Sequence, residues 1–359
     1  MIVADFRITV HRAYNYGSVL QCYALQEYLK GLGHDVRVID YRQKWTEATY
    51  YKQFSLYLIW QFVKRKDIHS IVAYWRNRKE RCRYIEQSKK IFSPFMEKIN
   101  LTNPYYRRMP SDFDVYLIGS DQLWSFQCVG GKDKIYIGDF KRPANSRVVG
   151  YAISSGIDSL LKLGASELKR IIGNFDKLSL REEENARMIN ELTGRKLPVT
   201  VDPVLLTDPS MWESMVNDEW KQRNHIVIYQ ARSVSGNPNY LKEKAKVLAW
   251  QLQCEIVELN TMTYSVTDFV SAIKYAKYVL TTSFHAVVFS LLMETPCYAI
   301  RLGDGLDVRY VDLLSKVGLE QELVGKDFVP VPFAIDFGMA KERLKAYRQE
   351  SIAFLQSAI

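Results

Sequence analysis

Residues 281–296, TTSFHAVVFSLLMETP, place a histidine directly before an apolar run, and the chain has only five histidines. Because an imidazole can donate a proton near neutral pH, His285 is our candidate for a general acid. Ser283 can cap a helix that begins at this point. The positive end of such a helix favours the neutral imidazole, and a bound anionic substrate favours the protonated form. The alternative interpretation is a hydrogen-bonded histidine in the core.

A second polar group follows the first predicted strand, in the sequence NYGS at residues 15–18. Gly17 permits a close backbone approach, Ser18 can cap the following helix, and the free N–H groups of its first turn favour an anion. We therefore expect Asn15, Gly17 and Ser18 to contact substrate. The segment lacks the complete glycine spacing of a dinucleotide site, and a tight turn with a capping serine is the alternative.

A third polar group, GSDQLW at residues 119–124, ends another predicted strand. An acid, an amide and an aromatic ring in close succession suit a sugar, whose hydroxyls bind polar groups and whose C–H face stacks on rings. The residues that we expect at the site are Ser120, Asp121, Gln122 and Trp124, with Asp121 as a second catalytic candidate beside His285. The alternative is a turn made by the aspartate, with the tryptophan in the core.

Arginines are candidates for binding carboxylate and phosphate, since a guanidinium donates to two oxygens at once. Arg181 follows the predicted strand KLSL, and we expect it at the mouth of the first domain. Its alternative role is an ion pair with the glutamates at 182–184 on a helix surface. The substrate-binding candidates in the second half of the chain, chosen by position, are Arg232, Arg301 and Arg309.

Short β-rich runs alternate with helix-patterned stretches along the chain, which is typical of parallel α/β layers. The predicted strands of the first series are 6–10, 36–41, 115–118, 148–153, 178–180 and 199–201. Those of the second series are 226–229, 255–259, 278–281 and 297–300. The fold class that we expect is α/β, with two Rossmann-like doubly wound domains facing a cleft.

Domain boundaries follow from the two strand series and from the polar, turn-rich segment between them. The expected N-terminal domain covers 1–208 and contains a basic, aromatic helical insertion at about 42–100. The expected junction, C-terminal domain and last helix are 209–224, 225–335 and 336–359. We expect the last helix to pack back on the N-terminal domain.

The insertion carries the whole charge excess of the chain. The net charge is +9, and residues 42–90 contain 13 lysines and arginines against 4 acidic residues. Aromatic residues alternate with these cations, as in YYKQFSLYLIWQFVKRK. Such a segment suits an anionic membrane surface, and the alternative is a solvated insertion that packs its aromatics inward. No standard nucleic-acid motif accompanies the cations, so we expect no nucleic-acid partner.

Composition indicates a folded chain with 47% hydrophobic and 25% charged residues, and 359 residues suit two domains. The five cysteines are far apart and form no CxxC pair, so we expect neither a disulfide framework nor a metal site, and a cytoplasmic location. The first ten residues include Asp5 and Arg7, and no apolar stretch reaches about 18 residues. We therefore expect no export and no membrane span.

Taken together, several segments resemble the polysaccharide pyruvyl transferase family in type and order, from residue 15 to about residue 314. The segments are NYGSVLQCYAL, GSDQLW, SLREEE, VDPVLL and the Ser283-Phe284-His285 triplet with its apolar helix. The resemblance covers most of the chain and is interrupted mainly by the basic aromatic insertion. The joint occurrence is more specific than any single segment.

The resemblance implies a fold similar to the two-domain GT-B glycosyltransferases. It also implies transfer of a pyruvyl group from phosphoenolpyruvate to a sugar of a cell-surface polysaccharide precursor, as a cyclic ketal. His285 would then be the acid, and Arg181 matches the arginine of the family's Ser-x-Arg-Glu element. No cofactor is expected, since phosphoenolpyruvate is the donor substrate.

One position departs from the family pattern. Better-understood members carry Arg-Leu-His where this chain has Ser283-Phe284-His285. An arginine expected near the donor is thereby missing. Either Arg301 or Arg232 supplies its charge from another loop, or the donor is a different acidic molecule. Ser283 is retained as a substrate-binding candidate.

Two other functions stay open from the sequence. One is an ordinary GT-B glycosyltransferase that uses a nucleotide sugar, and the other is a non-catalytic glycan- or membrane-binding member of the fold. For the transferase we expect a lipid-linked or oligosaccharide acceptor. We also expect the protein in the cytoplasm, with residues 42–90 as a contact to the inner face of the membrane.

Overall fold

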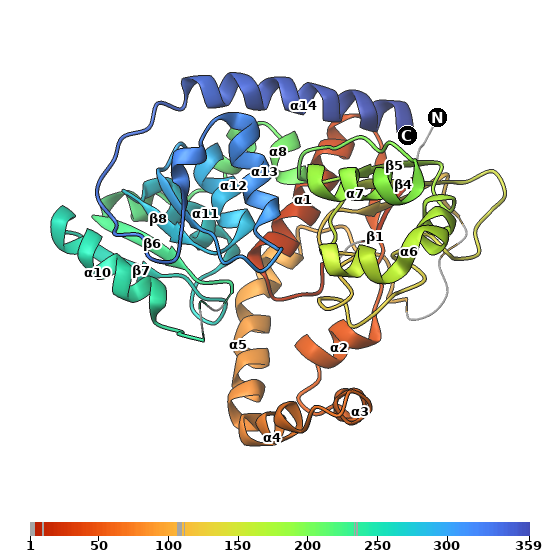
Figure 1. The fold of residues 1–359 in the computed structure, drawn as a ribbon, viewed down its shortest axis with the longest axis horizontal. Coiled ribbons are helices and arrows are strands. Elements are labelled where there is room, and N and C mark those ends of the chain that lie inside the picture. The colour runs from red at the N-terminus through yellow and green to blue at the C-terminus, as the bar shows by residue number, and fades with distance from the viewer. Residues whose placement is uncertain (1–3, 9–10, 106–109, 111, 233, 235) are drawn as a thin grey trace.

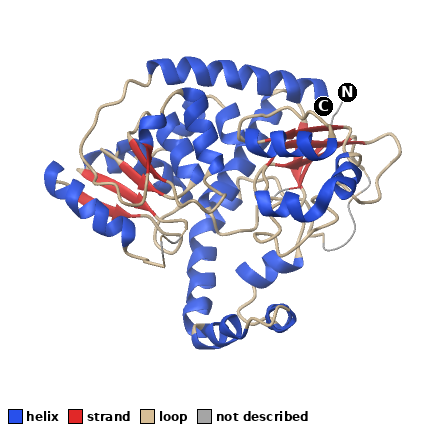
Figure 2. Ribbon diagram, viewed as in Figure 1, coloured by secondary structure: helices blue, strands red, loops and turns tan. Residues whose placement is uncertain are grey.

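The computed structural model describes residues 4–8, 11–105, 110, 112–232, 234 and 236–359, which form two α/β halves side by side (Figure 1). Within these residues, the first half contains a five-stranded parallel sheet in the order β2-β1-β3-β4-β5. Its strands are β1 (Ala4–Ile8), β2 (Asp35–Val38), β3 (Val115–Gly119), β4 (Arg147–Ile153) and β5 (Lys177–Leu180). Helices cover both faces of this sheet (Figure 2).

The described part of the second half contains another five-stranded parallel sheet, in the order β10-β9-β8-β6-β7. Its strands are β6 (His225–Tyr229), β7 (Glu255–Glu258), β8 (Val279–Thr281), β9 (Cys297–Ile300) and β10 (Leu323–Val324). Read from β7, this is the same order as in the first sheet. The two sheets confirm the expected α/β class with two doubly wound domains.

Two of the strand predictions need correction. The segment predicted as a strand at 199–201 forms only an isolated bridge between Val199 and Leu180. The short strand β10 was not predicted, because its two residues pair with the end of β9 and are too few to give a periodic pattern. The last two residues of the predicted strand 6–10 lie outside the described residues.

Strand sequences explain the sheet interiors. All five residues of β3, of sequence VYLIG, are buried, and so are all five of β6, of sequence HIVIY. Continuous burial without alternation is expected of parallel strands covered by helices on both faces. The helices that provide this cover and join the halves are α1 (Tyr16–Gly31), α6 (Ile157–Ile172), α7 (Glu183–Thr193), α8 (Pro203–Leu206), α9 (Pro209–Glu213), α10 (Tyr240–Leu252), α11 (Val266–Tyr275), α12 (Phe284–Leu292) and α13 (Val308–Val317).

A continuous core joins the two halves. Tyr16 at the start of α1 stacks on Phe269 of α11, with 4.5 Å between the ring centroids. Its hydroxyl donates to the carbonyl oxygens of Asn260 and Tyr264 at 2.7 and 2.8 Å. Residues 209–224 contain α9 and a short 3-10 helix, Asp218–Gln222, whose tryptophans are buried. The halves therefore meet through packed side chains as well as through the connecting chain.

The last helix, α14 (Gly338–Ala358), crosses both halves along one side of the molecule (Figure 1). It packs against α13 of the second half and α8 of the first. Ser351 accepts a hydrogen bond from Val201 N–H at 3.0 Å, and Arg348 donates to the Leu205 carbonyl at 2.7 Å. The chain thus returns to the first half after completing the second.

Four helices between β2 and β3 form a projection on the side of the molecule opposite α14 (Figure 1). They are α2 (Lys44–Tyr50), α3 (Leu56–Lys64), α4 (Ile68–Arg76) and α5 (Arg78–Met96). A small separate core of Ala48, Leu58 and Tyr74 holds α2, α3 and α4 together. None of the described helices is both long and apolar enough to cross a membrane.

Candidate active site

Loops from both halves line a single cavity of about 300 Å³. Most of the lining residues follow β1, β3, β6 and β8, at the carboxyl ends of these strands, and residues of α2 and of the start of α13 complete the lining. In each sheet, β1 and β3, or β6 and β8, are the neighbours at which the strand order reverses. Parallel sheets bind ligands at this reversal, because the connections leave it in opposite directions and open a crevice. The lining residues that carry chemistry are Asn15, Ser18, Thr46, Tyr50, Asp121, Gln122, Cys128, Arg232, Thr282, Ser283, His285 and Arg309.

His285 lies in the first turn of α12, as its sequence pattern predicts. Ser283 is the N-cap, and its side chain accepts a hydrogen bond from Ala286 N–H at 3.4 Å. The imidazole packs directly on Gly17 of α1. A Cβ atom at residue 17 would lie 2.0 Å from His285 Nδ1, so a residue with a side chain at this position would force the ring to move. Gly17 is required for the close approach of two helix ends.

The other side of the imidazole faces Asp202. His285 Nε2 lies 3.6 Å from Asp202 Oδ2, which is ion-pair distance when the ring is protonated. The same carboxylate oxygen accepts a hydrogen bond from Arg181 Nη1 at 2.8 Å. Its other oxygen accepts from Val204 N–H at 3.0 Å. Asp202 therefore fixes the ring and Arg181 relative to one another.

Burial and charge act in opposite directions on Asp202. Removal from water by itself raises the pKa of a carboxyl group. The charges of His285 and Arg181 lower the pKa of Asp202 by more than burial raises it. The pKa of Asp202 therefore lies well below its usual range. This fully buried side chain is an ionised partner for the histidine.

Asp121 faces the cavity from the first half. Its carboxylate accepts a hydrogen bond from the Ser18 hydroxyl at 2.7 Å and one from Gln122 N–H at 2.8 Å. Its φ of 77° lies in the left-handed region, which is uncommon for a residue with a side chain. Such strain occurs at functional sites, where the surrounding structure holds the residue in place.

Asn15 and Gln122 also line the cavity. Asn15 is the N-cap of α1, and its side chain accepts from Ser18 N–H at 3.3 Å. The Gln122 amide nitrogen has no hydrogen-bond partner among the described residues, although it is a buried donor. A buried donor without a partner is costly, so a ligand atom at this point would be stabilised.

Two of the predicted sugar-binding residues lie in the core and not in the cavity lining. Trp124 is 1% exposed and packs in the core of the first half, where its indole N–H donates to the Tyr136 carbonyl at 3.0 Å. Ser120 is completely buried, and its hydroxyl donates to the Ala152 carbonyl at 3.0 Å. Both residues lie on the side of the 119–124 loop that faces the sheet, so a ligand cannot reach them.

The four candidate arginines have different positions relative to the cavity. Arg301 is exposed and is not among the residues that line the cavity. Arg232 lines the cavity, but its guanidinium pairs with Asp304 and Asp307. Its charge is therefore largely balanced within the second half. It also donates to the Thr282 carbonyl at 3.2 Å, which holds two of the lining loops together.

Arg309 lines the same cavity and forms no ion pair with any carboxylate of the described residues. Its Nε–H donates to the Leu306 carbonyl at 3.0 Å. Burial, together with the charges of Arg181 and Arg232, lowers its pKa to about 10. A cation with this surplus of positive charge around it attracts an anion, so Arg309 is the best-placed arginine for an acidic ligand.

Arg181 lies behind the cavity lining, not at the mouth of the domain as predicted. Its side chain is 3% exposed and pairs with Glu182 and Asp202. Its guanidinium carbon lies 4.5 Å from the ring centroid of Phe284, while that of Arg309 lies 5.9 Å from the same ring. Phe284 thus contacts both cations. Arg181 does not line the cavity, and it contacts Phe284, which does.

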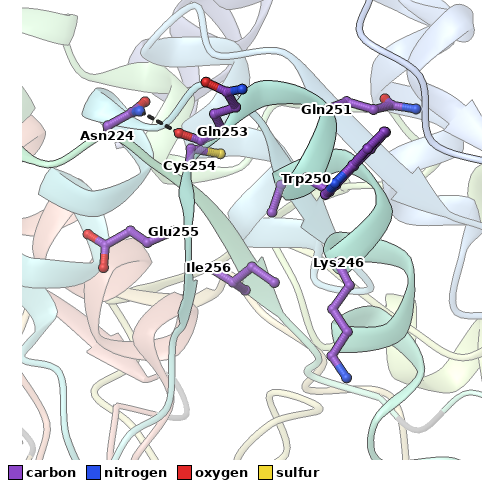
Figure 3. Close-up of a pocket in the computed structure, with 9 residues that line it drawn as sticks. Asn224, Lys246, Trp250, Gln251, Gln253, Cys254, Glu255 and Ile256 are labelled. Carbon is purple, nitrogen blue, oxygen red and sulfur yellow. Dashed lines mark hydrogen bonds between the residues drawn. The ribbon is translucent and has the colours of Figure 1, made fainter.

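A second hollow, of about 950 Å³, lies between the end of α10 and the start of β7 (Figure 3). It is open to solvent and is lined by Lys246, Trp250 and Glu255, among others. Glu255 is bound to Arg223 at 2.7 Å. This hollow lies at the amino end of an edge strand, whereas parallel sheets bind ligands at the carboxyl ends. We therefore place the active site in the cavity between the halves.

Among the described residues no group of three histidine, cysteine, aspartate or glutamate side chains could hold a metal ion. The hydrogen-bonding groups around the cavity are amide, hydroxyl, imidazole and guanidinium groups and the carboxylate of Asp121. Such a set is suited to an organic anion with hydroxyl-bearing neighbours.

The family model for polysaccharide pyruvyl transferases matches residues 15–304, which is most of the chain. The chain belongs to this family. A search of curated proteins finds no match. Among solved structures, the spinosyn rhamnosyltransferase SpnG is 8% identical, with a TM-score of 0.40 over 99% of this chain and 91% of that one. The glycosyltransferase SnogD from Streptomyces nogalater is 11% identical, with a TM-score of 0.39 over 99% and 96% of the two chains. The ADP-heptose heptosyltransferase II of E. coli is 10% identical, with a TM-score of 0.33 over 98% and 100%.

Five lining or supporting residues of this pyruvyl transferase family member were not singled out from its sequence, and Cys128 and Thr282 are two of them. Asp202 lies in the VDPVLL segment on which the resemblance rests, so its place in that segment was an available signal. Thr46 and Tyr50 come from α2 of the insertion and also line the cavity. No sequence feature separates these two from the other polar and aromatic residues of the insertion.

Proposed function

We propose that this protein transfers a pyruvyl group from phosphoenolpyruvate to two hydroxyls of a sugar in a polysaccharide precursor, forming a cyclic ketal. The observation that carries the proposal is the convergence of three groups on one cavity. His285 and Arg309 face it from the second half, and Asp121 faces it from the first. Family membership supports a transferase of this general kind.

Arg309 and the two helix ends are suited to the donor. The first turns of α1 and α12 both reach the cavity, and their free N–H groups carry partial positive charge. Phosphoenolpyruvate has a carboxylate and a phosphate, so two anionic groups need partners. Arg309 would take the place of the arginine that other family members carry at position 283, because it lies beside Phe284 and is free of carboxylate partners among the described residues.

The proposed reaction balances as follows. The methylene carbon of the donor gains one proton, for which His285 is the source, and its central carbon becomes electrophilic. One sugar hydroxyl adds to that carbon, and Asp121 is placed to accept its proton. A second hydroxyl of the same sugar then displaces phosphate by breaking the carbon–oxygen bond. Of the two hydroxyl protons, one replaces the proton given to the methylene carbon, and the other leaves with hydrogen phosphate.

Asp202 and Arg181 act through His285 in this scheme and touch no substrate. Asp202 is ionised and 3.6 Å from the imidazole, so it stabilises the protonated ring before transfer. Arg181 balances the remaining charge of that buried carboxylate. They are positioning residues.

The test is a comparison of donors and of two arginine variants. Titration calorimetry would measure binding of phosphoenolpyruvate and of UDP-glucose to the wild type, to Arg309→Gln and to Arg301→Gln. We expect phosphoenolpyruvate to bind the wild type and the Arg301→Gln control equally, and to bind Arg309→Gln at least ten-fold more weakly, because a charged hydrogen bond contributes about 1.5–3 kcal/mol. Phosphate release in the presence of a panel of oligosaccharides would then identify acceptors.

Binding of UDP-glucose without binding of phosphoenolpyruvate would contradict the proposal and favour a nucleotide-sugar glycosyltransferase. Equal donor affinity in Arg309→Gln would show that the anion site lies elsewhere. Neither result depends on knowing the acceptor sugar, since both are measured on the donor alone.

A further inference from the structure

Exposed apolar side chains concentrate at the end of the helical projection. Of the 15 large hydrophobic residues that are exposed in the described chain, seven lie between residues 54 and 75, and the others are scattered over the rest. The seven are Phe54, Leu56, Trp60, Val63, Ile68, Val72 and Trp75. We define residues 54–76, with helices α3 and α4, as the α3–α4 tip. It lies at the end of the projection farthest from both sheets (Figure 1).

These side chains form one stripe on each helix. On α3, Leu56, Trp60 and Val63 have the spacing i, i+4, i+7, and they are 72%, 54% and 57% exposed. On α4, Ile68, Val72 and Trp75 have the same spacing. Residues at this spacing share one face of a helix. Each helix therefore presents a continuous apolar face to solvent.

The exposed stripes are distinct from the residues that hold the projection together, because each of the two helices also buries other side chains in the small core. Leu58 and Tyr74 are buried in the small core of the projection, with Tyr57, Ile59 and Phe62 packed around them. The Tyr74 hydroxyl accepts from Ser55 N–H at 2.7 Å. The tip is thus folded and internally packed, and its outer apolar face is a second, additional surface.

Cations surround the apolar stripes. They are Lys64, Arg65 and Lys66 at the end of α3, Arg76 at the end of α4, and Arg78 and Lys79 at the start of α5, all exposed. Within the described chain none of the six forms an ion pair with a carboxylate. Lys64 lies over the ring of Trp60 at 5.3 Å. Apolar faces bordered by unpaired cations are complementary to a surface that is apolar inside and anionic outside.

We propose that the α3–α4 tip binds an anionic membrane surface. Each helix has nine residues and is about 13 Å long, so it lies on a bilayer whose apolar layer is about 30 Å thick. The aliphatic side chains enter the boundary between headgroups and acyl chains, and the tryptophans occupy the headgroup level. The cations pair with anionic headgroups.

Two other occupants fit the surface less well. A second copy of this chain would bring two sets of unpaired cations together, which like charge opposes. A single-stranded nucleic acid would pair with the cations and stack on the tryptophans, but it would leave Leu56, Val63, Ile68 and Val72 exposed. An anionic bilayer satisfies both the apolar and the basic residues.

The tip is connected to the cavity between the halves. Helix α2 begins the projection, and its Thr46 and Tyr50 line that cavity. Arg81 of α5 donates to the Ala48 carbonyl at 2.5 Å, which ties the base of the projection to α2. A protein attached by the tip therefore holds its cavity at a constant distance from the bilayer. The membrane proposal does not rest on the identity of the donor.

The experiment is sedimentation of the full chain with vesicles of phosphatidylcholine alone or with increasing phosphatidylglycerol. Three variants are compared with the wild type. The apolar variant combines Leu56→Gln, Trp60→Gln, Ile68→Gln and Val72→Gln, and the charge variant changes Lys64, Arg65, Lys66, Arg76, Arg78 and Lys79 to Gln. The control is Trp250→Gln, since Trp250 is 83% exposed on α10, outside the projection.

We expect the wild type and the control to sediment with phosphatidylglycerol vesicles at low salt. The charge variant should bind at least a hundred-fold more weakly, because it lacks six cations and each cation near the surface contributes about five-fold at low salt. The apolar variant should lose at least ten-fold at every salt concentration. Circular dichroism and the binding of phosphoenolpyruvate should be unchanged in all variants, which separates loss of docking from loss of fold.

Three results would overturn the proposal. The first is a wild type that does not sediment with anionic vesicles at low salt. The second is binding of a single-stranded oligonucleotide that is tighter than vesicle binding and insensitive to the apolar variant. The third is a wild type that forms a dimer without lipid in sedimentation velocity, when the apolar variant is a monomer.

Discussion

The sheets of the two halves have the same strand order, β2-β1-β3-β4-β5 in the first and β7-β6-β8-β9-β10 in the second. Each half directs the loops at its own reversal of strand order into the shared cavity. The first half contributes carboxylates, Asp121 in the cavity and Asp202 behind it, and the second contributes His285 and Arg309. Topology therefore determines where the loops meet, and loop sequence determines which charge each half brings.

The two halves also differ in the ionisation of a buried carboxyl group. Asp202 of the first half is kept ionised by His285 and Arg181. Glu322 of the second half accepts one hydrogen bond, from Cys297 N–H at 2.8 Å, and burial raises its pKa to about 8. Both are almost completely buried, so the difference between them comes from the presence or absence of a neighbouring cation.

Removal of His285 should have the largest effect on activity. We expect His285→Ala to reduce kcat by about 10²- to 10⁴-fold, the usual contribution of a positioned acid. The Kd of phosphoenolpyruvate should stay within several-fold of wild type, because the proton is needed only in the transition state. Steady-state kinetics with calorimetry measures both. A variant that keeps more than about a tenth of wild-type kcat would show that the histidine is structural.

The contact between the halves can be broken without removing any polar group. In Gly17→Ala the new methyl group would lie 2.0 Å from His285 Nδ1, so the ring must move. We expect kcat to fall about a hundred-fold, since a displacement of about 1 Å has this effect at other active sites. Gly31→Ala on the same helix is the matched control, because nothing lies within 4 Å of its Cβ position. Equal activity of the two variants would exclude a role for the close approach.

The ionised state of Asp202 should appear in the pH dependence of stability. Its folded pKa is lowered, so its contribution is present above the unfolded pKa and is lost as pH falls through the folded value. Asp202→Asn should lower the free energy of unfolding at pH 7 by about 2 kcal/mol and flatten the acid side of the profile. Urea unfolding between pH 3 and about pH 7 tests this. An unchanged acid profile would mean that another group controls it.

For Glu322 the pH dependence of stability should have the opposite sign to that for Asp202. Its folded pKa is raised, so stability is greatest below the unfolded pKa and decreases as pH rises towards about 8. Glu322→Gln keeps an oxygen for the Cys297 N–H and removes the buried ionisation. We expect it to raise the free energy of unfolding at pH 8 and to have little effect below about pH 4, where the carboxyl group is protonated in both the folded and the unfolded state. A destabilised variant at pH 8 would contradict the assignment.

Sequence reasoning located the cavity better than it identified the residues that line it. The strand pattern identified the loops after β1, β3, β6 and β8, because carboxyl ends of parallel strands meet at one edge. It could not tell which side of the loop at 119–124 faces the sheet, so Trp124 was expected at the site together with Asp121. Only the pairing of Arg232 with Asp304 and Asp307 distinguishes it from Arg309. That pairing joins residues more than 70 positions apart, and no local pattern encodes it.

The course of α14 limits how the molecule can open. The chain passes from the first half to the second through residues 209–224, and it returns through α14, which packs on α8 and α13. A relative rotation of the halves would therefore have to bend the chain at both crossings and break the packing of Tyr16 on Phe269.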